Sequence, residues 1–251
     1  KTLNIYMNKT YNKKENIFLS FLLVCLILFN TSCGLDTYYV IDPPTLVTNE
    51  PIYSSIDPSS WYFEFYTTEN DYEGVKFLGT EVYYKIYRSS SRMESEYKTI
   101  VATANNIETS SSAADKLINN YKYKPLGAYG NYSQSVLIPS AGMNRLVHIR
   151  LSDYPPYQAQ ILVGGANIYN SSSIVIPVRN ISRTGDNSFN FKNMDSSLRP
   201  KKGDEDVDYS GSGSDSIWYV AMFAVEVGQD STYSTINSNV LFLGSVTISA
   251  E

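Results

Sequence analysis

The sequence has little cysteine, histidine, glycine and proline. Two of its 251 residues are cysteine, one is histidine, and glycine and proline number 14 and 10. With 43% hydrophobic residues, this composition excludes a collagen-like chain and a wholly disordered one. Because His148 is the one histidine, a Ser-His-Asp triad has only one residue through which it can run. The sequence also has no Walker A loop, GxSxG elbow, HExxH or CxxC motif, so we expect no enzyme activity and no cofactor.

Positive charge is also scarce. The chain has 20 basic and 25 acidic residues, and residues 1–32 hold four of the lysines and only one glutamate. Removal of that stretch leaves a net charge of −8. Proteins that bind nucleic acid need a positive field to neutralise phosphates. We therefore expect no nucleic-acid partner.

The first 32 residues have the layout of a secretory signal. Lys9, Lys13 and Lys14 precede Ile17–Phe29, an uncharged run of 13 residues. That run is shorter than the roughly 20 residues that a membrane-spanning helix needs. A basic start, an apolar centre and small residues before a cleavage point are typical of signal peptides. We expect cleavage after residue 32 and Met7 as the natural start.

Cys33 follows Asn30, Thr31 and Ser32 directly after the apolar run. This arrangement resembles the lipobox of bacterial lipoproteins, in its looser spirochaete-like form, because Asn30 stands where the strict pattern prefers Leu. The resemblance implies acyl chains on Cys33 that bind the membrane. It also implies a location in the cell envelope, and Gly34 favours the outer membrane or cell surface. The alternative is a secreted protein whose cysteine has no such role.

The remaining chain alternates in the manner of β-strands. Residues 33–40 are expected to form a tether, and residues 41–249 an elaborated β-sandwich domain. Strands are predicted where apolar residues alternate or cluster between turn residues. They cover 61–67, 77–87, 135–138, 145–151, 158–163, 173–178, 188–191, 217–227 and 240–248. One short helix is predicted over 113–121, where apolar residues recur at helical spacing.

Three segments resemble a fibronectin type III domain. Glu81–Lys85 is similar to the central C strand of that family, Tyr219–Val225 to its F strand, and Ile41–Pro44 to its proline-bearing first strand. Trp61 lies where the family has a buried aromatic residue. The resemblance implies an all-β, fibronectin III/immunoglobulin-like antiparallel sandwich. It also implies a large insertion over about 90–215, which either elaborates the sandwich or forms a second small lobe.

A long acidic loop is predicted over 198–216, and it offers a weak metal candidate. Asp204, Asp206 and Asp208 alternate, and Asp215 follows at the twelfth position. Ca²⁺ prefers several oxygen ligands at such spacing, but Tyr209 stands where an EF-hand loop requires glycine. The favoured interpretation is therefore a solvated acidic loop, with a calcium site as the alternative.

Tyrosine is the residue in excess, with 22 copies. It suits contact surfaces because it combines apolar area with a hydroxyl group at little cost in side-chain entropy. Tyr83 and Tyr87 are predicted to be exposed, because they alternate with the apolar Val82 and Ile86. Tyr154 and Tyr157 flank a Pro-Pro pair on a predicted loop. These four tyrosines are the candidate binding residues, and packing is the alternative for each.

Two other candidates are weaker. His148 shares one face of a predicted strand with Leu146 and Arg150, and no second metal-ligating residue lies near it in the sequence. Glu64 and Glu81 would form a carboxylate pair for glycoside hydrolysis if their strands were neighbours.

The sequence thus predicts a membrane-anchored, non-enzymatic lipoprotein that binds a protein or glycan partner. One alternative is an accessory protein of a periplasmic envelope complex. Another is a carbohydrate-binding module.

Overall fold

The computed structural model describes residues 39–47, 50–106, 112–130 and 135–251. The strands in these ranges are β1 (Thr45–Leu46), β2 (Phe63–Tyr66), β3 (Val75–Tyr87), β4 (Lys124–Pro125), β5 (Gly127–Ala128), β6 (Ile138–Pro139), β7 (Leu146–Arg150), β8 (Gln160–Val163), β9 (Ala166–Asn167), β10 (Pro177–Val178), β11 (Val207–Asp208), β12 (Ile217–Asp230), β13 (Thr235–Asn237) and β14 (Leu241–Ser249). The helical segments are η1 (Pro58–Ser60), α2 (Ser90–Ala104), α3 (Ala113–Asp115), the π-helical turn η3 (Lys116–Asn120) and η4 (Ile168–Asn170). The signal peptide, Cys33 and most of the predicted tether lie outside the described residues.

The strands form two main sheets. The five-stranded sheet has the order β1-β2-β7-β8-β9, and all its pairs are antiparallel. The seven-stranded sheet is centred on the long antiparallel pair β3 and β12, with β13 and β14 beside β12. Three short strands, β4, β6 and β11, lie along the other edge of β3, and β11 alone is parallel to it. The predicted all-β antiparallel sandwich is therefore confirmed.

The main core lies between the two sheets. Phe63, Phe65 and Val147 point into it from the five-stranded sheet. Side chains at even positions of β3 and β12, such as Val82 and Trp218, enter it from the seven-stranded sheet. Alternation along the strands explains this pattern, because successive side chains point to opposite faces of a sheet.

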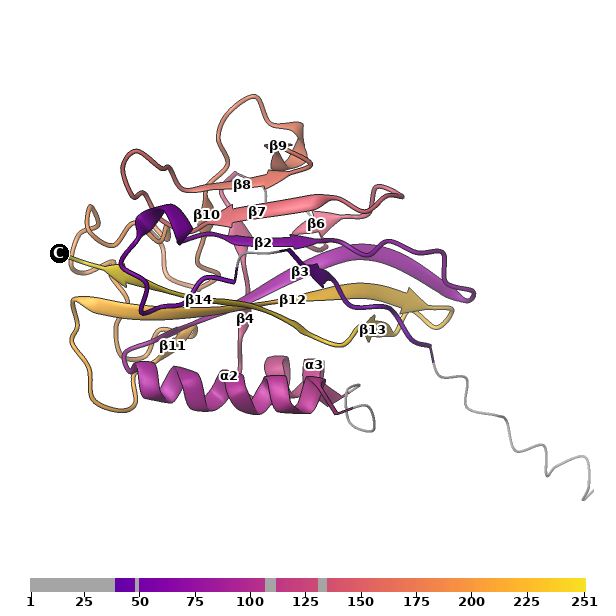
Figure 1. The fold of residues 1–251 in the computed structure, drawn as a ribbon, viewed down its shortest axis with the longest axis horizontal. Helices are drawn as coiled ribbons and strands as arrows, with labels where there is room; N and C mark the ends of the chain where they lie inside the picture. Colours follow the sequence, from indigo (N-terminus) through magenta and orange to yellow (C-terminus); the bar gives the residue numbers. More distant parts are fainter. Residues whose placement is uncertain (1–38, 48–49, 107–111, 131–134) are drawn as a thin grey trace, which may run out of the picture. The chain divides into compact units, whose positions relative to one another are not determined.

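A helical layer covers the other face of the seven-stranded sheet, and Figure 1 shows α2 and α3 along it. A second core fills the space between them, with Tyr87 and Phe223 from the sheet and Met93, Ile100 and Leu117 from the helices. Because both faces of β12 are buried, its sequence is a nearly continuous apolar run.

The helix predicted over 113–121 is present as α3 and η3, but the expectation of a single helix is wrong. The longer helix α2 was missed because its buried face includes the polar residues Glu96 and Thr103 beside Met93 and Ile100. Such a face lacks the apolar periodicity by which a helix is recognised in a sequence. Ser89 caps the start of α2 by accepting a hydrogen bond from the backbone N–H of Arg92.

Residues 39–251 form one compact unit. Segments within 90–215 contribute β7, β8 and β9 to the five-stranded sheet, and β4, β6 and β11 to the edge of β3. This stretch therefore elaborates the two sheets and supplies the helical layer.

Candidate functional site

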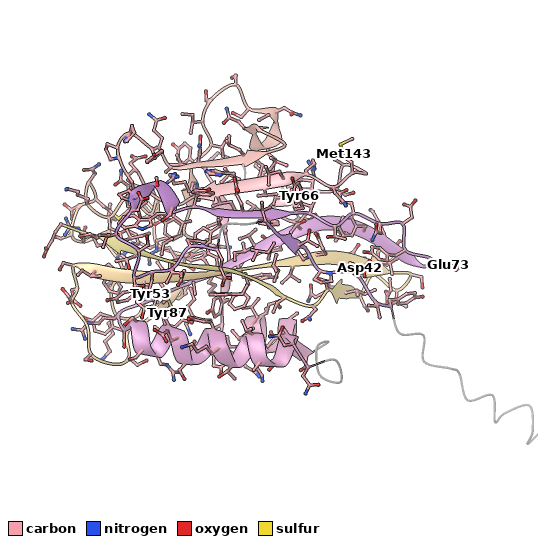
Figure 2. The ribbon with its side chains drawn as sticks, viewed as in Figure 1. Asp42, Tyr53, Tyr66, Glu73, Tyr87 and Met143 are labelled. Atoms are coloured by element: carbon pink, nitrogen blue, oxygen red, sulfur yellow. The ribbon has the colours of Figure 1, made fainter. Side chains whose placement is uncertain are left out.

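The predicted exposure of Tyr83 and Tyr87 is wrong. Both side chains do lie opposite Val82 and Ile86, but the helical layer covers that face. Tyr87 is fully buried, and its hydroxyl group lies 2.8 Å from Glu96 Oε2 and 2.9 Å from the Tyr123 hydroxyl. Figure 2 shows Tyr87 at the level between α2 and the sheet. Tyr83 is half-buried against the same core, so Tyr87 is closed to a partner and Tyr83 is largely covered.

Tyr154 and Tyr157 lie on the predicted loop, but only one of them is at the surface. Tyr154 packs edge-on against Trp61, with ring centroids 4.6 Å apart, and donates a hydrogen bond to the carbonyl of Thr247. The side chain of Tyr157 is 39% exposed, and the Arg150 guanidinium lies 4.6 Å from its ring centroid. Tyr154 is therefore a packing residue, while Tyr157 remains accessible.

Tyr157 ends a row of stacked side chains on the outer face of the five-stranded sheet. Arg150 also lies over the ring of Tyr62, and Tyr62 stacks on His148 with centroids 4.6 Å apart. His148 Nδ1 lies 3.0 Å from a carboxylate oxygen of Glu64. Because neighbours occupy the faces of the Tyr62 ring, this row does not offer the open aromatic platform on which a sugar would stack.

Glu64 and Glu81 do not form the carboxylate pair considered for glycoside hydrolysis. Glu64 belongs to β2 and the five-stranded sheet, whereas Glu81 belongs to β3 and the seven-stranded sheet. Their strands are not neighbours, so the condition for that pair is not met.

The four aspartates of the acidic segment do not converge on one point. Asp204 and Asp206 both bind Arg179, at 2.7 Å from its Nη2 atom. Asp208 lies 3.3 Å from Arg92 Nε, and Asp215 accepts a hydrogen bond from the Tyr209 hydroxyl. Among the described residues, no group of three or more His, Cys, Asp or Glu is arranged to hold a metal ion.

Both interpretations of the acidic loop therefore need correction. The four aspartates do not form a calcium site, because they pair with different arginine side chains instead of converging on one point. The solvated loop is wrong for Asp206, which is fully buried and also accepts a hydrogen bond from the Tyr84 hydroxyl at 2.7 Å. Buried carboxylates of this kind are stable only when they are paired and hydrogen-bonded.

The most site-like feature is a cavity of about 850 Å³ beside the edge of β3. Its volume lies within the range typical of small-molecule sites. Residues from four stretches line it: 125–129, 135–137, 176 with 178–181, and 185–187. Glu81 and Tyr169 complete the wall. No sequence motif connects these segments, and only the folded sheet brings them together.

Glu81 is the unusual residue of this wall. β4 and β6 pair with β3 on either side of it, at residues 83–84 and 79–80. In the gap between them, the Glu81 carboxyl accepts a hydrogen bond from the backbone N–H of Val82 at 3.1 Å. No ion pair to Glu81 is present in the described part of the chain. Burial raises the pKa of Glu81 to about 8, although hydrogen bonds from the backbone of Val82 and Leu137 lower it.

Tyr169 is a second polar residue of the wall. Its backbone adopts a left-handed conformation with φ of 62°, and its hydroxyl donates to the carbonyl of Leu137 at 2.8 Å. Burial, with a smaller contribution from the charge of Glu81, raises the pKa of Tyr169 to about 12. Non-glycine residues with such backbone strain are concentrated at functional sites.

Two further polar atoms in residues of this wall lack partners. Asn187 Oδ1 is a buried acceptor and Arg179 Nη1 a buried donor, and neither has a hydrogen-bond partner within the described residues. Leaving such a group unpaired costs about 1–3 kcal/mol. A carboxyl with a perturbed pKa in the wall of a cavity is a feature by which an unassigned binding site is recognised.

The comparisons with known proteins identify no relative: no protein-family model, no curated protein and no solved structure matches this chain. The likenesses to fibronectin type III domains and to spirochaete lipoproteins therefore stay predictions. None of the helices in the described ranges is long and apolar enough to cross a membrane.

Proposed function

We propose that this chain is a membrane-anchored, non-enzymatic binding module of the bacterial cell envelope, and that its ligand site is the Glu81 cavity. The observation that carries the proposal is the buried Glu81 carboxyl, which lines a cavity of about 850 Å³ without a cationic partner among the described residues. A carboxyl in that environment is costly unless a ligand or solvent satisfies it.

The position of the one histidine supports a binding role rather than catalysis. His148, the one histidine of the chain, is not part of the cavity wall and is engaged by Glu64 and Tyr62 on the outer face of the five-stranded sheet. Glu64 lies in the other sheet, so it does not complete the carboxylate pair with Glu81 that was considered for glycoside hydrolysis.

A screen of small molecules by thermal shift tests the cavity. Ile176 lines the cavity, so Ile176→Trp narrows it, whereas Ile174→Trp places the same ring at a position that is 50% exposed and outside the wall. We expect compounds that raise the melting temperature of the wild type and of Ile174→Trp but not of Ile176→Trp. Compounds that stabilise all three proteins equally, or a screen without any binder, would reject the cavity as the site.

The anchor is tested separately through Cys33. Metabolic labelling with a palmitate analogue is expected to label the wild type and not Cys33→Ser, because the thiol of Cys33 is the proposed attachment point. Equal labelling of both proteins, or of neither, would contradict the proposed anchor.

Protease treatment of intact source cells separates the alternatives for location. Loss of the chain while a periplasmic control survives supports a surface-exposed binding module. Protection until the envelope is broken supports the accessory protein of an envelope complex, and a stoichiometric partner in a pull-down from solubilised membranes would strengthen that alternative.

A further inference from the structure

We propose that the Glu81 cavity binds a small ligand with an ammonium group, and that the ammonium group lies against the Glu81 carboxylate. This inference rests on the proposed function, because it names the class of ligand for the same site.

The charge balance of the wall favours a cation. Arg179 is the one basic side chain of the wall, and Asp204 and Asp206 already neutralise it at 2.7 Å. The other charged residues of the wall are the acids Glu81 and Asp186. An anionic ligand would therefore meet the buried Glu81 carboxyl and the exposed Asp186 without a free positive charge to offset them.

The Glu81 carboxyl indicates a ligand that donates hydrogen bonds, because both of its oxygen atoms accept them once it has lost its proton. An ammonium group carries three donors and no acceptor. An amino alcohol is a simple ligand of this class.

The aromatic residues of the wall are compatible with this class. Tyr129 and Tyr169 both line the cavity. Tyrosine rings attract cations electrostatically through their faces. The acidic character of the whole chain, with a net charge of −5, also raises the local concentration of cations.

The proposal predicts a specific pH dependence. Below about pH 8 the Glu81 carboxyl of the free protein holds a proton. An ammonium ligand must displace that proton, so its affinity is expected to rise as the pH increases from 6 to 8, and to level off above. A primary amine stays charged over this range, because its pKa is near 10.4.

The closing experiment compares two probes of the same shape. trans-4-Aminocyclohexanol carries an ammonium group where trans-1,4-cyclohexanediol carries a hydroxyl group. Affinities are measured by NMR titration at pH 6 and pH 8 for the wild type, Glu81→Gln and Glu64→Gln. Glu64 is the matched control, since its carboxylate pairs with His148 outside the cavity.

We expect the amine to bind the wild type and Glu64→Gln about tenfold more tightly than the diol at pH 8, a difference of about 1.4 kcal/mol. This preference should shrink at pH 6 and disappear in Glu81→Gln.

Equal affinities for the two probes, or a preference that survives Glu81→Gln, would overturn the ammonium ligand. If the diol binds the wild type better than the amine and Ile176→Trp abolishes that binding, the ligand class is wrong while the proposed cavity site stands. If neither probe binds and the wider screen is also empty, both proposals fail.

Discussion

At the scale of single residues, Glu81 carries a cost that depends on pH. Its pKa is raised by burial to about 8 in the folded protein, against 4.5 for an ordinary glutamate. Between these values the unfolded chain has released the proton while the folded chain still holds it. Stability therefore falls as the pH rises from about 4.5 to about 8, by roughly 3–5 kcal/mol in total.

The substitution Glu81→Gln should remove this fall, because the amide does not ionise. Urea denaturation across pH 4–8 is expected to show the variant gaining a few kcal/mol on the wild type as the pH rises through that window. Glu73→Gln serves as the control and should keep the wild-type pH dependence, because Glu73 is exposed. A parallel pH dependence of the wild type and Glu81→Gln would show that Glu81 has an ordinary pKa.

Asp206 is the second residue with a large expected effect. It is fully buried and holds Arg179 Nε at 2.9 Å and Nη2 at 2.7 Å. Asp206→Ala removes the main counter-charge of a buried guanidinium, which costs about 3–5 kcal/mol. The neighbouring Glu205 lies 3.9 Å from Lys124 at the surface, so Glu205→Ala should cost less than about 1 kcal/mol. Chemical denaturation measures both, and equal costs would contradict a buried ion pair.

At the scale of elements, Gly79 explains how β6 reaches the edge of β3. Its φ is 136°, and a Cβ atom there would lie 2.1 Å from the carbonyl oxygen of Ile138. Gly164 also has a positive φ, of 62°, but nothing lies within 4 Å of its Cβ position. Gly79→Ala should therefore cost at least about 2 kcal/mol more than Gly164→Ala, in thermal or chemical denaturation. Similar costs would mean that β6 does not pair there.

Helix α2 provides a test of the helical layer. Ile100 is fully buried in the second core, whereas Thr99 beside it is exposed. We expect Ile100→Ala to reduce the free energy of unfolding by about 2–5 kcal/mol, and Thr99→Ala to change it by less than about 0.5 kcal/mol. A small effect of Ile100→Ala would indicate that α2 does not pack on the sheet.

The elements that were predictable from the sequence are those with strong local patterns. Alternation located β3, and the apolar run located β12, because strand periodicity is a local property. Alternation separates the two faces of a strand but does not show whether the second face is covered. The helical layer over Tyr83 and Tyr87 was therefore not predictable from it. α2 was missed because Glu96, which pairs with Lys85, occupies its buried face.

The candidate site was not predictable at all. Glu81 reads as an ordinary polar residue of an alternating strand, and its burial depends on where β4 and β6 pair with β3. Arg179 and Asp206 are 27 positions apart and form their ion pair only across the folded edge. Neither arrangement has a signature in local sequence, because each depends on contacts between distant segments.

At the scale of the whole molecule, the seven-stranded sheet is shared by two cores. Val82 enters the core between the sheets, and Phe223 enters the core beneath the helices. Loss of this sheet would expose both cores, so residues 39–251 should unfold in one cooperative transition. Trp218 lies in the first core and α2 borders the second. Tryptophan fluorescence and far-ultraviolet circular dichroism should therefore give the same midpoint. Separate midpoints would mean that the helical layer unfolds independently.

The central claim is that the Glu81 cavity holds a small ligand, and native mass spectrometry of protein purified gently from source membranes tests it most directly. Apart from any mass attached covalently at Cys33, the wild type and Ile174→Trp should carry a noncovalent ligand of a few hundred daltons at most, which is released on denaturation, and Ile176→Trp and Glu81→Gln should lack it. A noncovalent mass that all four proteins retain would contradict the claim, and so would its absence from the wild type.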